Sequence, residues 1–102
     1  MFGKMGDMMG KMQEMKQKSE EVKKRLDTIS VSGEAENGKV AVICTGNRKI
    51  ISVQISEELF AENDKEQIEE LTIMAVNRAL EKAEKLAEVE MAGVARGMLP
   101  GL

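Results

Sequence analysis

The sequence has no histidine, tryptophan or tyrosine, and its only aromatic side chains are Phe2 and Phe60. The absence of histidine excludes the commonest general base, histidine-based triads and most zinc sites. A single cysteine, Cys44, cannot form a disulfide within the chain, which favours a reducing cytoplasm. No stretch approaches the roughly 20 apolar residues of a membrane span, and charged residues interrupt the N-terminal apolar run that a signal peptide would need. We therefore expect a cytoplasmic protein that does not enter a membrane.

The remaining groups that can carry chemistry have simpler explanations. Cys44 lies in a predicted strand, on its core face, and is interpreted as a small buried hydrophobe rather than a nucleophile. The early glycines lack the preceding strand and the following Lys-Ser/Thr of a phosphate-binding loop. The carboxylates that follow residue 56 are interpreted as a solvated helix start rather than as metal ligands; they are Glu57, Glu58, Glu62, Asp64, Glu66, Glu69 and Glu70. We expect no enzyme, catalytic residue, metal, cofactor or small-molecule substrate.

The charges are unevenly distributed along the chain. The whole sequence carries 15 basic and 18 acidic side chains, a net charge of −3. Residues 1–29 have seven basic and five acidic groups, whereas residues 57–102 have five basic and eleven acidic groups. Nucleic-acid-binding domains are often basic, so the overall balance argues weakly against that function. On charge alone, only the N-terminal segment is compatible with nucleic-acid binding.

Residues 4–26 are predicted to form one long helix. Its apolar side chains follow a heptad repeat, with Met5, Met12 and Leu26 at position a and Met8, Met15 and Val22 at position d. A stripe this narrow is typical of a helix that meets another helix. We interpret the methionines as a packing seam, with an adaptable surface for a protein partner as the alternative.

The charges of this helix are sorted around its axis. Cations flank the apolar stripe, with Lys4, Lys11, Lys18 and Arg25 at position g and Lys16 and Lys23 at position e, while the acids lie away from it. One explanation is that the cations pair with Glu81, Glu84 or Glu88 of a neighbouring helix. The other is that they neutralise phosphates, which requires only regularly placed cations. The spacing by itself leaves both open.

The middle of the chain changes to a two-residue period, which predicts strands. We expect a three-stranded antiparallel meander with strands at about 28–35, 39–45 and 49–55. Asn37-Gly38 is a strong signal for a two-residue hairpin turn, and this turn would place Ala35 opposite Val40.

A second two-residue turn is predicted at Gly46-Asn47, which would place Ile43 opposite Ile50 on the outer face of the sheet. A three-stranded sheet has two open edges, which proteins tend to cover. We therefore predict a homodimer, with Ile43 and Ile50 at its interface.

Ser56 is predicted to cap a short helical turn at 57–61, and Asn63 with Glu66 to start a long helix by a capping box. This helix should run from about Asp64 to Met91 and cover one face of the sheet. We expect a single α+β domain over 1–102, with a helical arm at 1–27, a sheet at 28–55, a short turn and long helix at 56–92 and a flexible tail at 93–102.

Several motifs, in order and spacing, resemble the YbaB/EbfC family of bacterial nucleoid-associated proteins. They are Met1-Phe2-Gly3-Lys4, Val31-Ser32-Gly33, Asn37-Gly38-Lys39-Val40-Ala41-Val42, Gly46-Asn47-Arg48-Lys49, Val53-Gln54-Ile55-Ser56, Asp64-Lys65-Glu66, Glu69-Glu70-Leu71, Ala75-Val76-Asn77-Arg78-Ala79 and Gly97-Met98-Leu99-Pro100-Gly101. The resemblance covers nearly the whole chain.

This resemblance implies an α-β-β-β-α subunit, a tweezer-like homodimer formed through the sheet region, and binding of double-stranded DNA by the helical arms in the nucleoid. The cations that it makes candidates for DNA contact are Lys4, Lys11, Lys16, Lys18, Lys23, Lys24, Arg25, Arg78 and Lys82. On the last helix, Lys85 is named with Arg78 and Lys82 as a contributor. Such a protein would organise the nucleoid and influence gene expression without catalysis. The alternative from another class is a protein–protein adaptor that uses the methionine seam.

Overall fold

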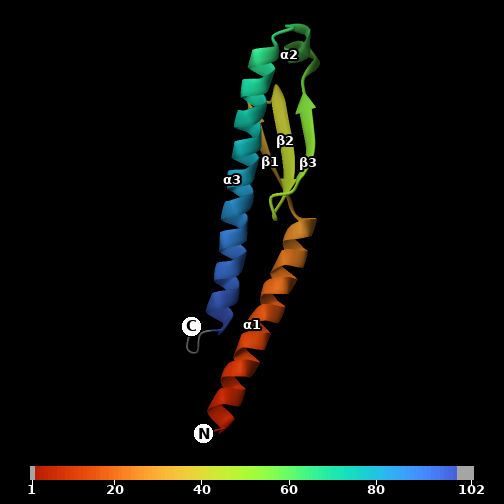
Figure 1. Ribbon diagram of the computed structural model, residues 1–102. Helices are drawn as coiled ribbons and strands as arrows, with labels where there is room; N and C mark the ends of the chain where they lie inside the picture. The colour runs from red at the N-terminus through yellow and green to blue at the C-terminus, as the bar shows by residue number, and fades with distance from the viewer. Residues whose placement is uncertain (1, 99–102) are drawn as a thin grey trace.

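The computed structural model describes the backbone of residues 2–98 and the side chains of residues 8–96. The elements follow the order α1 (Phe2–Thr28), β1 (Ser30–Ala35), β2 (Val40–Thr45), β3 (Ile50–Ile55), α2 (Glu57–Ala61) and α3 (Lys65–Met98). This is the α-β-β-β-α order predicted from the sequence. The molecule is elongated, 72 by 21 by 19 Å, because α1 and the second half of α3 both leave the sheet at the same end (Figure 1).

The three strands form one antiparallel sheet in the order β1-β2-β3. The predicted register of the first hairpin is confirmed, since Ala35 faces Val40. Asn37 and Gly38 both have positive φ, 54° and 85°, as a type I′ turn requires.

The predicted register of the second hairpin is wrong by two residues. Ile43 faces Ser52, and Ile50 faces Cys44 across a bulge at Ile43/Cys44. The strands are joined by four residues, 46–49, rather than two, and Thr45 N donates to Lys49 O at 2.8 Å. The pair Ile43–Ile50 expected on the outer face therefore does not form.

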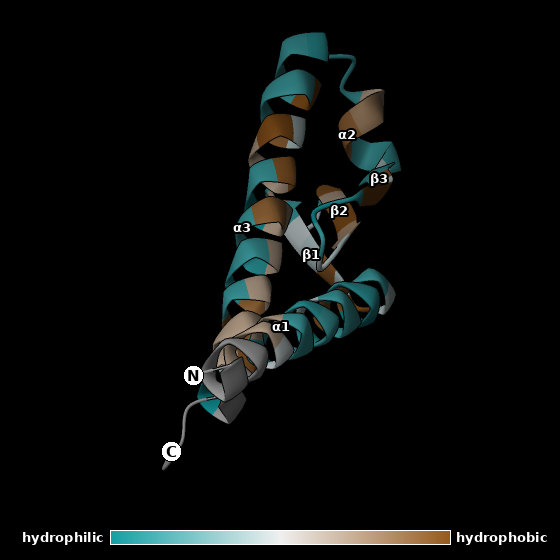
Figure 2. Cartoon of the chain, turned by 60° about the horizontal axis from the view of Figure 1, so that its bottom comes forward, coloured by the Kyte–Doolittle hydropathy of each residue, from teal (hydrophilic) through white to brown (hydrophobic). Residues whose placement is uncertain are grey.

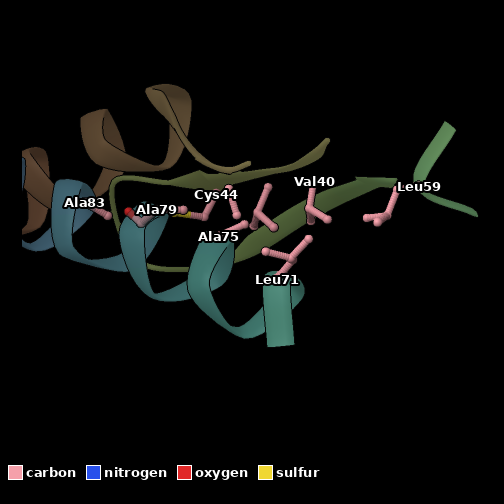
Figure 3. Close-up of a cluster of buried hydrophobic side chains, with 9 residues drawn as sticks. Val40, Cys44, Leu59, Leu71, Ala75, Ala79 and Ala83 are labelled. Carbon is pink, nitrogen blue, oxygen red and sulfur yellow. Dashed lines mark hydrogen bonds between the residues drawn. The ribbon is translucent and has the colours of Figure 1, made fainter. Parts of the chain in front are cut away.

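The core lies between the sheet and α3 (Figure 3). Val40, Val42 and Cys44 of β2 are fully buried against α3, whose apolar stripe turns toward the strands (Figure 2). The residues that α3 buries in this core are Leu71, Ala75, Ala79 and Ala83. Because they are mostly alanines, the helix backbone lies very close to β1. A Cβ built on Gly33 would lie 2.3 Å from both Ala75 O and Ala79 N.

The ends of the last two helices differ partly from the prediction. Ser56 caps α2 as expected, accepting from Leu59 N at 3.1 Å. Asp64, not Asn63, caps α3 by accepting from Gln67 N at 3.1 Å, whereas Asn63 takes a left-handed conformation with φ 56°. The helix also continues past Gly93 to Met98, so the tail expected from residue 93 is helical as far as the structure describes it. Residues 99–102 lie outside the described part.

Candidate nucleic-acid interface

The cations of α1 lie along a helix that projects from the sheet (Figure 1). Those at positions 11, 16, 23, 24 and 25 are exposed, and Lys18 is half-buried beside Glu14, with 3.4 Å between Nζ and Oε1. The side chain of Lys4 lies outside the described residues. The arm therefore carries a series of solvent-accessible cations.

The apolar stripe of α1 is packed only near the sheet. Val22 and Leu26 are each 2% exposed, and Leu26 lies against Gly46 of the β2–β3 connection. Met8, Met12 and Met15, which continue the stripe, are 65%, 68% and 46% exposed. The stripe is thus packed at Val22 and Leu26, whereas the methionines interpreted as a packing seam are uncovered at these three positions.

The β2–β3 connection fixes the last turns of α1. Asn47 Nδ2 donates to Lys23 O at 2.8 Å and also to Asp27 Oδ1, while Gly46 N donates to Leu26 O at 3.0 Å. The sequence identified Gly46-Asn47 only as a turn signal. The structure gives Asn47 a second task, because its side chain holds the base of the arm.

One cation of α1 pairs with α3. Arg25 Nη2 donates to Glu90 Oε2, and their side chains are 54% and 26% exposed. The pairing expected with Glu81, Glu84 or Glu88 does not occur among the described residues, and Lys11, Lys16, Lys23 and Lys24 form no ion pair there. Pairing within the chain therefore accounts for Arg25 but not for these lysines.

The cations of α3 gather beside the outer strand β1. Arg78, Lys82 and Lys85 are spaced by four and three residues, which places them on one face of the helix. They line an open hollow of about 460 Å³ together with Glu81 and with Ser32 and Glu34 of β1. Arg78 Nη1 donates to Glu34 O at 2.6 Å. The sequence had named all three as the candidate cations of this helix, and the structure places them around one hollow.

The far edge of the sheet is uncovered and apolar. The helix α3 lies over β1 and β2, and β3 exposes Ile50, Ile51, Val53 and Ile55 by 43%, 59%, 46% and 39%. Ile43, on the outer face of β2, is half-buried beside Ser52, whose Oγ has no partner among the described residues.

The single cysteine lies in the packed core. Cys44 Sγ lies 3.5 Å from Ala79 O, and burial raises the pKa of the Cys44 thiol. Within the described residues, no group of three or more His, Cys, Asp or Glu side chains is placed to hold a metal ion. None of the helices, over the part of the chain described, is long and apolar enough to cross a membrane.

Comparison with known proteins assigns the chain to a family. The sequence model of the YbaB/EbfC DNA-binding family matches residues 1–98. A nucleoid-associated protein of Geobacillus sp. is 46% identical over 101 residues, covering 98% of this chain and 94% of the relative. Another nucleoid-associated protein, from Halalkalibacterium halodurans, is 44% identical over 99 residues, covering 96% of each.

A solved structure supports the fold independently. The crystal structure of an uncharacterized protein from Helicobacter pylori superimposes with a TM-score of 0.64 at 22% identity, covering 86% of this chain and 98% of that one. The sequence match along the chain and its curated relatives lead to one conclusion: this protein belongs to the YbaB/EbfC DNA-binding family.

Proposed function

We propose that this protein binds double-stranded DNA as a homodimer, mainly through phosphate contacts, and that it acts in the nucleoid of the bacterial cytoplasm. One observation carries the proposal: α1 presents exposed lysines along a projecting helix, and four of them have no acidic partner among the described residues. Cations placed this way neutralise phosphates without reading bases. The protein would thus organise the nucleoid and influence gene expression without catalysis.

The contacting groups follow from exposure and pairing. The first set is Lys11, Lys16, Lys23 and Lys24, and Lys18 joins it because an exposed pair with Glu14 is easily exchanged. Lys4 occupies heptad position g, as Lys11 and Lys18 do. Arg25 contributes only when its bond to Glu90 opens. On α3, Arg78 and Lys82 with Lys85 form a second cationic surface beside β1.

The proposed dimer uses the uncovered edge strand β3. A free, apolar edge strand is a template for association, and Ile50, Ile51, Val53 and Ile55 are all exposed there. Pairing through this edge would cover these side chains and leave both α1 arms accessible. Ile50 and Ile43 remain proposed interface residues, Ile50 from the edge and Ile43 from the adjoining outer face.

A second function class is favoured by one feature, the exposed Met8, Met12 and Met15. Methionine-rich helical surfaces adapt to varied protein partners, so the same arm suits an adaptor. Salt separates the two functions, because releasing counterions from DNA makes affinity strongly salt-dependent.

The test is a fluorescence anisotropy titration of labelled duplex DNA with the full chain at roughly 50 and 200 mM salt, using two duplexes of unrelated sequence. With six to ten phosphate contacts, affinity should fall by about 10³- to 10⁵-fold between these salt concentrations, with a similar loss for both duplexes. No detectable binding at the lower salt, or an affinity that does not change with salt, would exclude the proposed mechanism and favour the adaptor.

A further inference from the structure

The side chain of Asn47 connects the base of α1 to the β2–β3 connection. Its Nδ2 group donates one hydrogen bond to Lys23 O at 2.8 Å and another to Asp27 Oδ1. Because these two acceptors are four residues apart, the bonds hold α1 over about one turn, roughly 6 Å along its axis. The backbone adds a third bond, from Gly46 N to Leu26 O at 3.0 Å. Together these bonds fix the tilt of α1 relative to the sheet.

Asn47 is itself held in place by the end of β2. Thr45 is buried, with 7% of its surface exposed, and its Oγ1 accepts hydrogen bonds from Asn47 N and Lys49 N, both at 3.3 Å. Thr45 O accepts a further bond from Arg48 N at 2.9 Å. The connection is therefore fixed to β2 around Asn47, and the amide group meets α1 at a defined position.

The arm beyond this point is exposed to solvent. Residues 8–17 are all exposed, and the packed side chains of the apolar stripe, Val22 and Leu26, lie at the base. Apolar packing has no preferred direction, whereas hydrogen bonds weaken when their angles change. Arg25 and Glu90 form another link, to α3, but exposed ion pairs contribute little to stability. Packing thus attaches the arm, and the bonds of the amide group set its direction.

The direction of the arm matters because the lysines proposed to contact phosphates are far from its base (Figure 1). Lys11 lies twelve residues before Lys23, which is about 18 Å along the helix axis. A tilt of about 10° at the base would move Lys11 by about 3 Å, the full length of a hydrogen bond to a phosphate oxygen. Duplex DNA is stiff over such distances and does not follow this displacement.

We propose that Asn47 is a positioning residue for DNA binding, which keeps the lysines of α1 in the orientation that a duplex accepts without itself contacting the DNA. The inference rests on the proposed function, since it requires that α1 contacts phosphates. An arm that takes this orientation only a tenth of the time raises the apparent Kd about tenfold, and up to about a hundredfold when both arms of a dimer must be in place. The number of phosphates contacted in the complex stays the same, so the salt dependence of the affinity does not change.

The test compares wild type and Asn47→Ala, both as full chains, in anisotropy titrations of labelled duplex DNA at several salt concentrations. The substitution removes both side-chain hydrogen bonds without changing the charge. We expect the affinity to fall by about tenfold or more at every salt concentration, while the slope of log affinity against log salt equals that of wild type. Asn77→Ala removes an exposed amide group from α3 and should bind as wild type does.

Hydrogen exchange of the backbone amides separates a loosened arm from a loosened fold. In Asn47→Ala the amides of α1 should exchange faster than in wild type, whereas those of β2 should keep their protection, because only the arm is released.

An exchange of the two side chains provides a second check. Asn47→Asp places a carboxylate against that of Asp27 and should weaken DNA binding. Adding Asp27→Asn returns the net charge to that of wild type and should recover part of the affinity, because an amide again donates to a carboxylate.

Three results would overturn the positioning role while leaving DNA binding by the wild type in place. They are wild-type affinity in Asn47→Ala, a shallower salt slope in that variant, and exchange that is accelerated in β2 as much as in α1. If the wild type itself does not bind DNA, the proposed function and this role fail together, so the wild-type titration distinguishes the two failures.

Discussion

Among the glycines described, Gly33 is the one at which an added methyl group should lower the free energy of unfolding most. A Cβ at this position would lie 2.3 Å from Ala75 O, 2.3 Å from Ala79 N and 2.9 Å from Ala79 Cα. All three are backbone atoms of α3, so no side chain can rotate away. The helix must move off β1, which loosens the core around Val42 and Cys44.

Gly33→Ala should therefore destabilise the protein by at least the roughly 1–3 kcal/mol typical of overpacking. For a domain of this size, each kcal/mol lowers the Tm by about 4–8 °C. The assay is thermal unfolding followed by circular dichroism, with wild type and variant at one protein concentration because a dimer's Tm depends on it.

Gly10→Ala is the matched control. It adds the same methyl group to an exposed position of α1 where nothing lies within 4 Å of the new Cβ. Alanine is a better helix former than glycine by up to ~1 kcal/mol, so this variant should melt at or above the wild-type temperature. If Gly33→Ala has the same Tm as Gly10→Ala, the close contact between β1 and α3 is not as described.

Three further predictions follow from the turn, the edge strand and the core. Gly38 has φ 85°, so Gly38→Val should lower the free energy of unfolding by roughly 1–3 kcal/mol, and unchanged urea denaturation would refute this turn geometry. Val53→Lys places a charge on the proposed dimer edge and should shift sedimentation toward monomer, whereas Ser30→Lys, on the opposite edge strand, should not; equal behaviour would place the interface elsewhere. Burial raises the pKa of the Cys44 thiol, so the native state holds this proton to a higher pH than the unfolded chain. The free energy of unfolding should keep its full contribution from Cys44 below about pH 8.5 and decrease above it. Cys44→Ala should lack this part of the decrease, and identical pH profiles for the two proteins would argue against a buried Cys44 thiol.

Local signals predicted most of the fold. The hydrophobic repeat predicted both long helices. Asn37-Gly38 predicted the first hairpin register, because Asn and Gly tolerate the positive φ that both residues adopt in this turn. Ser56 was predicted correctly as a cap, because its hydroxyl accepts a hydrogen bond from Leu59 N, only three residues further along the chain. In each case the residue's role depends on neighbours close in sequence.

The errors arose where a residue with a local signal has a tertiary role. Gly46 looked like a turn glycine, but a Cβ there would lie 2.8 Å from Leu26 Cδ2, and the positive φ belongs to Arg48, at 64°. Asn47 looked like its turn partner, but its side chain holds α1. The second register failed for this reason and because the bulge beside Cys44 has no sequence signal.

The candidate site was predicted only in part for a similar reason. The sequence placed the lysines on one helix, but which of them pair depends on how α1 and α3 are arranged. Glu90, which bonds Arg25, lies on a different side of α3 from Glu84 and Glu88, and only the packing of α1 selects it. The gathering of Arg78, Lys82 and Lys85 beside Glu34 likewise requires the position of α3 over β1.

The central claim, that the α1 arm binds phosphates, is tested most directly by the salt dependence of DNA affinity in two charge-matched variants. Lys11→Gln/Lys16→Gln removes two exposed lysines of the arm. Lys39→Gln/Lys65→Gln removes two lysines at the other end of the molecule, the half-buried Lys39 and the exposed Lys65, which pair with Glu62 and Glu69. Both changes should leave the fold intact, since charges and ion pairs at the protein surface contribute under ~1 kcal/mol each.

For a dimer, the arm variant loses up to four phosphate contacts, so the slope of log affinity against log salt should become shallower by up to about 3.6. The control variant should keep the wild-type slope. Equal slopes for the two variants, or a steeper loss in the control, would contradict the assignment of DNA binding to α1.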